Sequence, residues 1–126
     1  KDKRWFYRRR RLLMSWYNII KGKNDGGTCY PDAYRWMMNN THSMGDSAKL
    51  AHATVTGTGG GIEGVEYGHA FILINNGFVI DVATGSEVGF PKDVYYKTGN
   101  VKDVKLYTFD EMLKVSMAEG TYGPWD

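Results

Sequence analysis

Two apolar runs separated by a short polar turn constrain the fold of this chain more than any other feature. The first run covers residues 67–74 and the second covers residues 78–83, with Asn75, Asn76 and Gly77 between them. An Asn-Gly pair between two apolar runs is the strongest short-range signal for a β-hairpin. The sequence therefore predicts two antiparallel strands, at about Tyr67–Ile74 and Phe78–Ala83.

The length of the turn decides which side chains of the hairpin share a face. A two-residue loop places Ile72 opposite Asp81 and points His69 to the other face of the sheet. A three-residue loop places Phe71 opposite Asp81, and His69 then becomes its diagonal neighbour on the same face, about 7–8 Å away. Three-residue loops favour a left-handed glycine at their end, where Gly77 stands. The sequence permits either register.

Apolar residues at helical spacing predict two helices before the hairpin. The first covers residues 10–21, and its stripe consists of Leu12, Leu13, Trp16, Ile19 and Ile20. The second is expected from about Cys29 to Asn40, with Thr28 as the N-cap and Pro31 in the first turn, where its missing N–H costs little. Residues 41–50 are polar and are expected to be irregular.

The remaining segments complete an α+β pattern. Strands are expected at residues 51–56 and 101–107, and a glycine-rich loop at residues 57–64. Thr108 and Glu111 match a capping box before a short helix, Phe109–Ala118, and the tail after it is expected to pack on the body. Helices followed by a run of strands indicate N-terminal helices packed on a small antiparallel sheet.

The length of 126 residues fits a single domain, 1–126. Charged residues are distributed unevenly along this domain. Residues 1–23 hold nine Lys or Arg and one acid, whereas residues 24–126 hold seven Lys or Arg and thirteen acids. A basic arm of this kind, with Arg8, Arg9, Arg10 and Arg11 at its centre, can bind nucleic acid or an acidic partner. It can equally lie as a solvated helix against the acidic side of its own domain.

Secretion and membrane insertion are not indicated by the sequence. A single cysteine excludes an internal disulfide framework, and no apolar stretch typical of a signal peptide follows the basic start. The longest aliphatic or aromatic run, Ala70–Ile74, is far shorter than the ~20 residues of a spanning helix. We therefore expect a soluble, cytoplasmic protein. Residue 1 is lysine rather than methionine, which favours a trimmed or processed start.

Cys29, His69 and Asp81 supply, in this order, the parts of an activated cysteine nucleophile. A thiolate attacks, an imidazole takes and returns a proton, and a carboxylate orients the ring. Each residue alone also has a structural interpretation, as a small buried hydrophobe, a core histidine and a strand-end carboxylate. An aspartate between Ile80 and Val82 is costly unless it has a partner or faces water, which favours a common site for the three.

The segments around these residues resemble the papain-like cysteine peptidase superfamily. The resemblance rests on Gly27-Thr28-Cys29 at a helix start, Gly68-His69-Ala70-Phe71 on a strand, and Ile80-Asp81-Val82-Ala83-Thr84 at the end of the next. The closest branch is the transglutaminase-core cysteine hydrolases, in which an Asp-Pro-Thr-like segment ends that strand. Here Ala83 replaces the proline. Bacterial cell-wall cysteine endopeptidases have a similar hairpin, but usually with histidine at the third position, so Asp81 favours the first branch.

The resemblance covers about residues 27–84 and implies a fold and a mechanism. The implied fold is a helix packed on an antiparallel sheet. The implied mechanism is a thioester intermediate with Cys29 as nucleophile, His69 as base and Asp81 as the residue that orients His69. The resemblance does not imply cross-linking, because many members of this group resemble peptidases, deamidases or amidases instead, so the reaction on an amide or peptide bond is implied only as a class.

The donor for an oxyanion remains open at this point. The backbone N–H of Cys29 is the default donor, because N–H groups at a helix start can bind an anion. Asn24 could supply a side-chain amide and Tyr17 could line the pocket, although they serve equally well as a loop residue and a packing residue.

Cofactor and metal sites are not expected. Gly59, Gly61 and Gly64 match a GxGxxG pattern, but a strand rather than a helix is expected after it, so we interpret the segment as a loop. The histidines His42, His52 and His69 lack zinc spacing, and His52 is expected at the surface or at a strand edge.

Two classes of function therefore follow from the sequence. The first is a cysteine hydrolase or acyl transferase that acts on an amide or peptide bond. The second is a non-enzymatic binding module, either an inactive papain-like fold or a protein that binds nucleic acid or an acidic partner through its basic arm.

Overall fold

The computed structural model describes residues 29–57, 63–82 and 89–125, and its core is a five-stranded sheet in the order β4-β3-β2-β1-β5. The strands are β1 (Ala48–Thr56), β2 (Glu66–Ile74), β3 (Phe78–Ile80), β4 (Phe90–Pro91) and β5 (Lys102–Tyr107). The helical elements are α2 (Cys29–Met44), the 3-10 turn η2 (Gly45–Ser47), α3 (Lys92–Gly99) and α4 (Phe109–Glu119). All strand pairs are antiparallel, so the expected α+β class with a small antiparallel sheet is confirmed.

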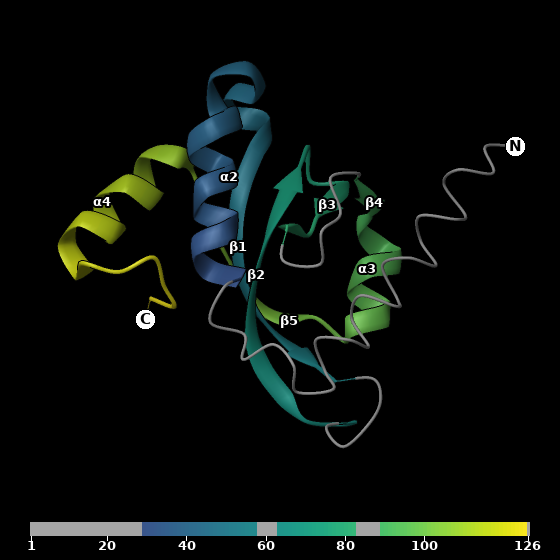
Figure 1. Ribbon diagram of the computed structural model, residues 1–126. Coiled ribbons are helices and arrows are strands. Elements are labelled where there is room, and N and C mark those ends of the chain that lie inside the picture. Colours follow the sequence, from purple (N-terminus) through teal and green to yellow (C-terminus); the bar gives the residue numbers. More distant parts are fainter. Residues whose placement is uncertain (1–28, 58–62, 83–88, 126) are drawn as a thin grey trace, which may run out of the picture.

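Helices cover both faces of this sheet. Figure 1 shows α2 and α4 on one side of the long β1–β2 pair and α3 on the other. One core cluster lies on the α3 side and contains Ala51, Ala53, Val55, Phe71, Leu73, Val79, Phe90 and Tyr95. The other lies beneath α2 and includes Ala33, Met37, Leu50, Ala70, Ile72 and Met112. Successive residues of β1 and β2 thus alternate between two buried faces, as the two-residue period of a strand requires.

The hairpin that joins β2 to β3 adopts the three-residue register. Ile72 pairs with Ile80, Leu73 with Val79, and Ile74 with Phe78, so residues 75–77 form the turn. The left-handed residues of this turn are Asn75 (φ 52°) and Asn76 (φ 57°), and not Gly77 as we expected. Asparagine tolerates this conformation better than most side chains do, which explains the pair of asparagines.

Helix α2 is longer than predicted. The expectation of irregular structure over residues 41–50 is wrong, because the helix continues to Met44 and β1 begins at Ala48. The polar residues near the end of α2 suit a half-buried or exposed helix surface, and the side chains of Asn40 and Thr41 donate to main-chain oxygens one turn earlier. Gly45, at a φ of 58°, then ends the helix.

The C-terminal helix agrees closely with its prediction. Thr108 and Glu111 form the expected capping box at the start of α4, where the backbone N–H of Thr108 donates to Glu111 Oε1 at 2.9 Å and that of Glu111 to Thr108 Oγ1 at 3.1 Å. The helix ends one residue later than predicted, before a left-handed Gly120. Beyond it, Trp125 is buried against the body, as expected for the tail.

Several sequence predictions lie outside the described residues. These are the helix at residues 10–21, the Thr28 cap and the conformation of Gly59 and Gly61. Within the described ranges, no helix has both the length and the apolar character that crossing a bilayer requires.

His52 is buried, and its predicted position at the surface or a strand edge is therefore wrong. It lies on β1, between β2 and β5, with 5 % of its surface exposed, among the rings of Tyr30, Tyr107 and Trp125. Gly123 of the tail packs so tightly on the ring that a Cβ there would stand 2.6 Å from His52 Cε1. Burial, with a smaller effect of the Lys105 charge, lowers the pKa of His52 to about 4.

This burial predicts a loss of stability in acid that originates at His52. Between about pH 6.5 and pH 4 the unfolded chain binds a proton at His52 and the folded chain does not, so the free energy of unfolding falls as the pH falls through this range. We expect His52→Phe to reduce this loss by roughly 2 kcal/mol. Urea denaturation of both proteins at pH 7, 5.5 and 4.5 measures the difference, and parallel curves for the two would contradict it.

Candidate functional site

Cys29 is the first residue of α2, as the sequence predicted. Pro31 lies in the first turn of the helix. Ala33 and Met37 are buried in the same core cluster as Cys29 and hold this face of α2 against the sheet. The thiol is placed where the positive end of the helix dipole favours a negative charge. Only 2 % of the surface of Cys29 is exposed, and its side chain is hydrogen-bonded to that of His69.

His69 reaches the thiol from β2, beyond the last residue that pairs with β3. The β2–β3 ladder ends at the pair of Ile72 with Ile80, so Asp81 is the first residue after β3 and lies diagonal to His69 across the hairpin. His69 Nε2 lies 2.9 Å from Asp81 Oδ2, with 2 % and 0 % of the two side chains exposed. The diagonal arrangement that the three-residue turn predicts is therefore present.

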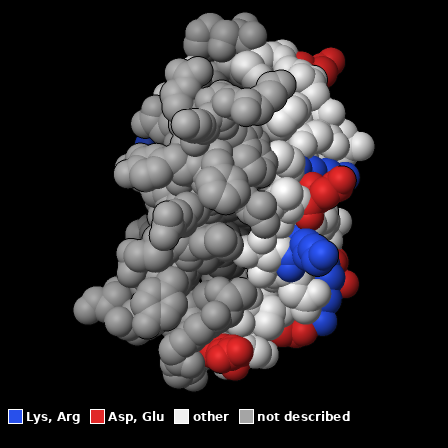
Figure 2. Space-filling model, turned by 90° about the vertical axis from the view of Figure 1, so that its right-hand side faces the viewer, with Lys and Arg blue, Asp and Glu red and all other residues white. Residues whose placement is uncertain are grey.

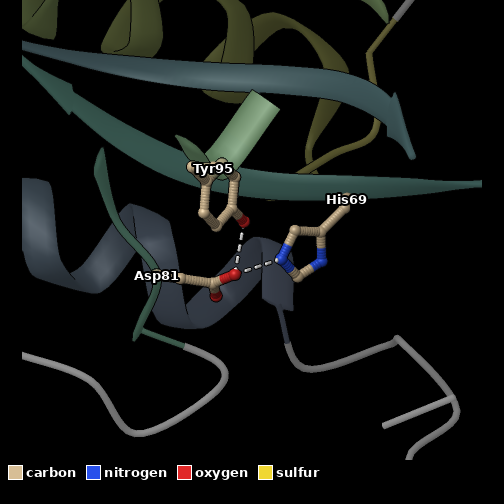
Figure 3. A network of polar contacts seen from close by, with 3 residues as sticks. All are labelled: His69, Asp81 and Tyr95. Carbon is tan, nitrogen blue, oxygen red and sulfur yellow. Dashed lines mark hydrogen bonds and ion pairs between the residues drawn. The ribbon is translucent and has the colours of Figure 1, made fainter. Parts of the chain in front are cut away.

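Tyr95 of α3 completes the surroundings of Asp81. Its buried hydroxyl donates to Oδ2 of Asp81, the same oxygen that faces His69 (Figure 3). Oδ2 of Asp81 thus has two hydrogen-bond partners in a place that water does not reach. Burial and the adjacent Asp81 charge raise the pKa of Tyr95 well above its usual value, so its hydroxyl stays protonated and acts as a donor.

Sequence reasoning missed Tyr95 because it missed α3. The signals for this helix are present: Asp93 stands in its first turn, Lys97 in its last, and a left-handed Asn100 follows it. These signals could have identified the helix. Nothing in the sequence, however, shows which of Tyr95 and Tyr96 contacts Asp81.

The His69–Asp81 pair is strongly coupled electrostatically. Burial lowers the pKa of His69, but the Asp81 charge and hydrogen bond, together with Cys29, outweigh it and raise the value to about 10. The imidazole is therefore protonated at neutral pH. A protonated ring carries a proton on each nitrogen, so that it can donate both to Asp81 and to Cys29.

Tyr67 is a second tyrosine that sequence reasoning did not single out. It lies two residues before His69 on the same face of β2, with the two ring centroids 6.4 Å apart. Its hydroxyl is buried and has no hydrogen-bond partner among the residues that the structure describes. Burial, Asp81 and Cys29 all raise the pKa of Tyr67, so this hydroxyl is also neutral.

Other candidate residues cannot be placed relative to this site. Asn24, Tyr17 and the basic residues Arg8–Arg11 lie outside the described residues. On the face shown in Figure 2, the described Lys and Arg side chains alternate with Asp and Glu and form no single-signed field. The His, Cys, Asp and Glu side chains of the described ranges form no group of three or more that could hold a metal ion.

Comparison with known proteins gives no further guide to the site: no family model, no curated protein and no solved structure matches the chain.

Removal of the Tyr95 hydroxyl tests its contribution to this buried network. In Tyr95→Phe the Asp81 carboxylate loses a donor inside the protein, so we expect the free energy of unfolding at pH 7 to fall by about 1–3 kcal/mol. Urea denaturation measures the change. Tyr96→Phe is the matched control, because Tyr96 is half-buried in the same helix and packs on Phe71. Equal stability of the two variants would contradict the assigned role.

Proposed function

We propose that this protein is a cysteine hydrolase or acyl transferase that acts on an amide or peptide bond. The observation that carries the proposal is the convergence of Cys29, His69 and Asp81 from a helix start, a strand and the end of the next strand. A thiol next to an imidazole whose far nitrogen faces a buried carboxylate is the arrangement that activates a cysteine nucleophile.

The proposed reaction has two halves. The Cys29 thiolate attacks the carbonyl carbon of the substrate, so that a C–S bond forms and the carbonyl π electrons move to oxygen. The tetrahedral intermediate collapses, the C–N bond breaks, and His69 gives its proton to the departing nitrogen. A water molecule or an amine then loses a proton to His69 and attacks the thioester, and the C–S bond breaks to regenerate Cys29.

Asp81 acts through His69 in this scheme. Its contact with Nε2 leaves the other ring nitrogen for the thiol, and its negative charge favours the imidazolium. Tyr95 keeps the carboxylate in place and is a positioning residue rather than a catalytic one.

We further propose that the chain is related to the papain-like superfamily, and within it to the transglutaminase-core hydrolases. The support is the combination of a cysteine at the first residue of a core helix, a histidine on β2 and an aspartate directly after the neighbouring antiparallel strand β3. Ala83, where that branch has proline, is the departure from its pattern.

A non-enzymatic binding function receives no support from the described residues. The basic arm that suggested it lies outside them, and the described charges in Figure 2 are of mixed sign. An inactive papain-like fold differs from an active one in the reactivity of the thiol, which can be measured directly without knowledge of the substrate.

The rate at which iodoacetamide alkylates Cys29 between pH 5 and pH 9 tests the proposal. Cys29 is the only cysteine, so the label is unambiguous in a mass spectrum. An ordinary thiol with a pKa of ~8.5 is almost entirely protonated at pH 6. We expect the folded protein to be labelled at least about tenfold faster at pH 6 than the urea-unfolded chain, because His69 is protonated there and stabilises the thiolate.

His69→Ala is the informative variant, because it removes the imidazolium. Its labelling rate should rise with pH as that of an ordinary thiol does. Folded protein that is labelled no faster than the unfolded chain at pH 6, or only after it unfolds, would make Cys29 structural and remove the basis of the proposed function.

A further inference from the structure

Tyr67 has a buried hydroxyl without a hydrogen-bond partner among the residues that the structure describes. A buried donor without an acceptor costs free energy, so its presence at a site calls for an explanation. One explanation is that its acceptor belongs to a molecule that enters the site during the reaction.

The position of Tyr67 matches this explanation. It shares a face of β2 with His69, and its ring meets the imidazole edge-on at an interplanar angle of 76°. Cys29, Asp81 and Tyr95 are close enough to interact electrostatically with its hydroxyl. The hydroxyl is therefore near the thiol at which an acyl group would form, and on the same face as the base.

The comparison with Tyr95 separates the two tyrosines by role. The hydroxyl of Tyr95 is committed to Asp81. The hydroxyl of Tyr67 has no such partner among the described residues, and burial, together with the neighbouring Asp81 and Cys29, opposes its ionisation. A phenol that stays protonated beside a nucleophile can donate a hydrogen bond to an oxygen that becomes negative.

We propose that the hydroxyl of Tyr67 donates a hydrogen bond to the acyl oxygen of the substrate and stabilises the oxyanion that forms when Cys29 attacks. The C–S bond forms and the carbonyl π electrons become a lone pair on this oxygen, while the proton stays on Tyr67. The backbone N–H at the start of α2 is the natural second donor. The assignment rests on the proposed thiol chemistry of Cys29 and adds a catalytic residue to it.

Two electrophiles distinguish this role from every role that acts through the thiol itself. Iodoacetamide alkylates sulfur by displacement at a saturated carbon, so no oxyanion develops. 4-Nitrophenyl acetate acylates sulfur through a tetrahedral oxyanion. In Tyr67→Phe we expect the second-order rate of acylation by the ester to fall by about a hundredfold, the size of effect typical of one oxyanion donor. The alkylation rate and its pH profile should stay as in the unmodified chain.

Tyr96→Phe is the control, and a urea titration shows whether each variant is folded. If Tyr67→Phe proves unfolded, 3-fluorotyrosine introduced at position 67 replaces it. This residue keeps a more acidic donor, so acylation should become faster with alkylation unchanged, and acylation that is unchanged or slower would overturn the proposal.

Three further results, all from the two electrophiles, would overturn the proposed role of Tyr67. Acylation that is unchanged in Tyr67→Phe shows that the hydroxyl is not used, and equal losses in acylation and alkylation show that it acts on the thiol. An unmodified chain that is alkylated rapidly at pH 6 but is not acylated contradicts acyl transfer and, with it, an oxyanion donor. An unmodified chain that is alkylated no faster than its unfolded form instead identifies the failure as that of the proposed function.

Discussion

The contact between His69 and Asp81 is the constraint on which the rest of this structure depends. It joins β2 to the residue that follows β3, with 2.9 Å between two side chains that are essentially without exposure to water. Only one register of the hairpin permits it, because a slip by one residue would point His69 to the opposite face of the sheet. The Asn75-Asn76-Gly77 turn fixes that register by adopting a left-handed conformation at its two asparagines. A local conformational preference in the turn therefore determines a long-range electrostatic contact.

A buried ion pair is weak evidence for stability, because removing two charges from water costs several kcal/mol, which their attraction only partly offsets. The structure reduces this cost with a second donor to Asp81, the hydroxyl of Tyr95, which a separate helix brings to the site. A protein that needs such positions only for folding can use apolar side chains there without losing stability. The proposed thiol chemistry would explain a polar pair at this place next to Cys29, and it would also give a partner to the Tyr67 hydroxyl, which has none among the described residues.

Local sequence patterns predicted much of the secondary structure, whereas contacts between segments far apart in the sequence were not predicted. The hairpin, the start of α2 at Cys29 and the capping box at Thr108 each depend on a few adjacent residues, and each is present. The end of α2 was misjudged because a polar helix surface has the same composition as a loop. His52 was misjudged because the residues that bury it, Tyr30, Tyr107 and the tail, come from separate segments of the chain, the tail more than seventy positions away. Tyr95 could not be assigned for the same reason, since its partner is fixed by the packing of α3 on the sheet.

The protonation state of His69 tests the account most directly, and an NMR titration of the imidazole resonances measures it without any substrate. We expect His69 to be protonated at pH 7–8 and to titrate far above the ~6.5 of a free histidine, and we expect Asp81→Asn to lower this midpoint. His52 is an internal reference, because burial lowers its pKa to about 4, whereas the pKa of His69 is raised from the same free value. A midpoint for His69 at or below ~6.5 would show that the imidazolium–carboxylate pair does not form, and the account of the site would be wrong.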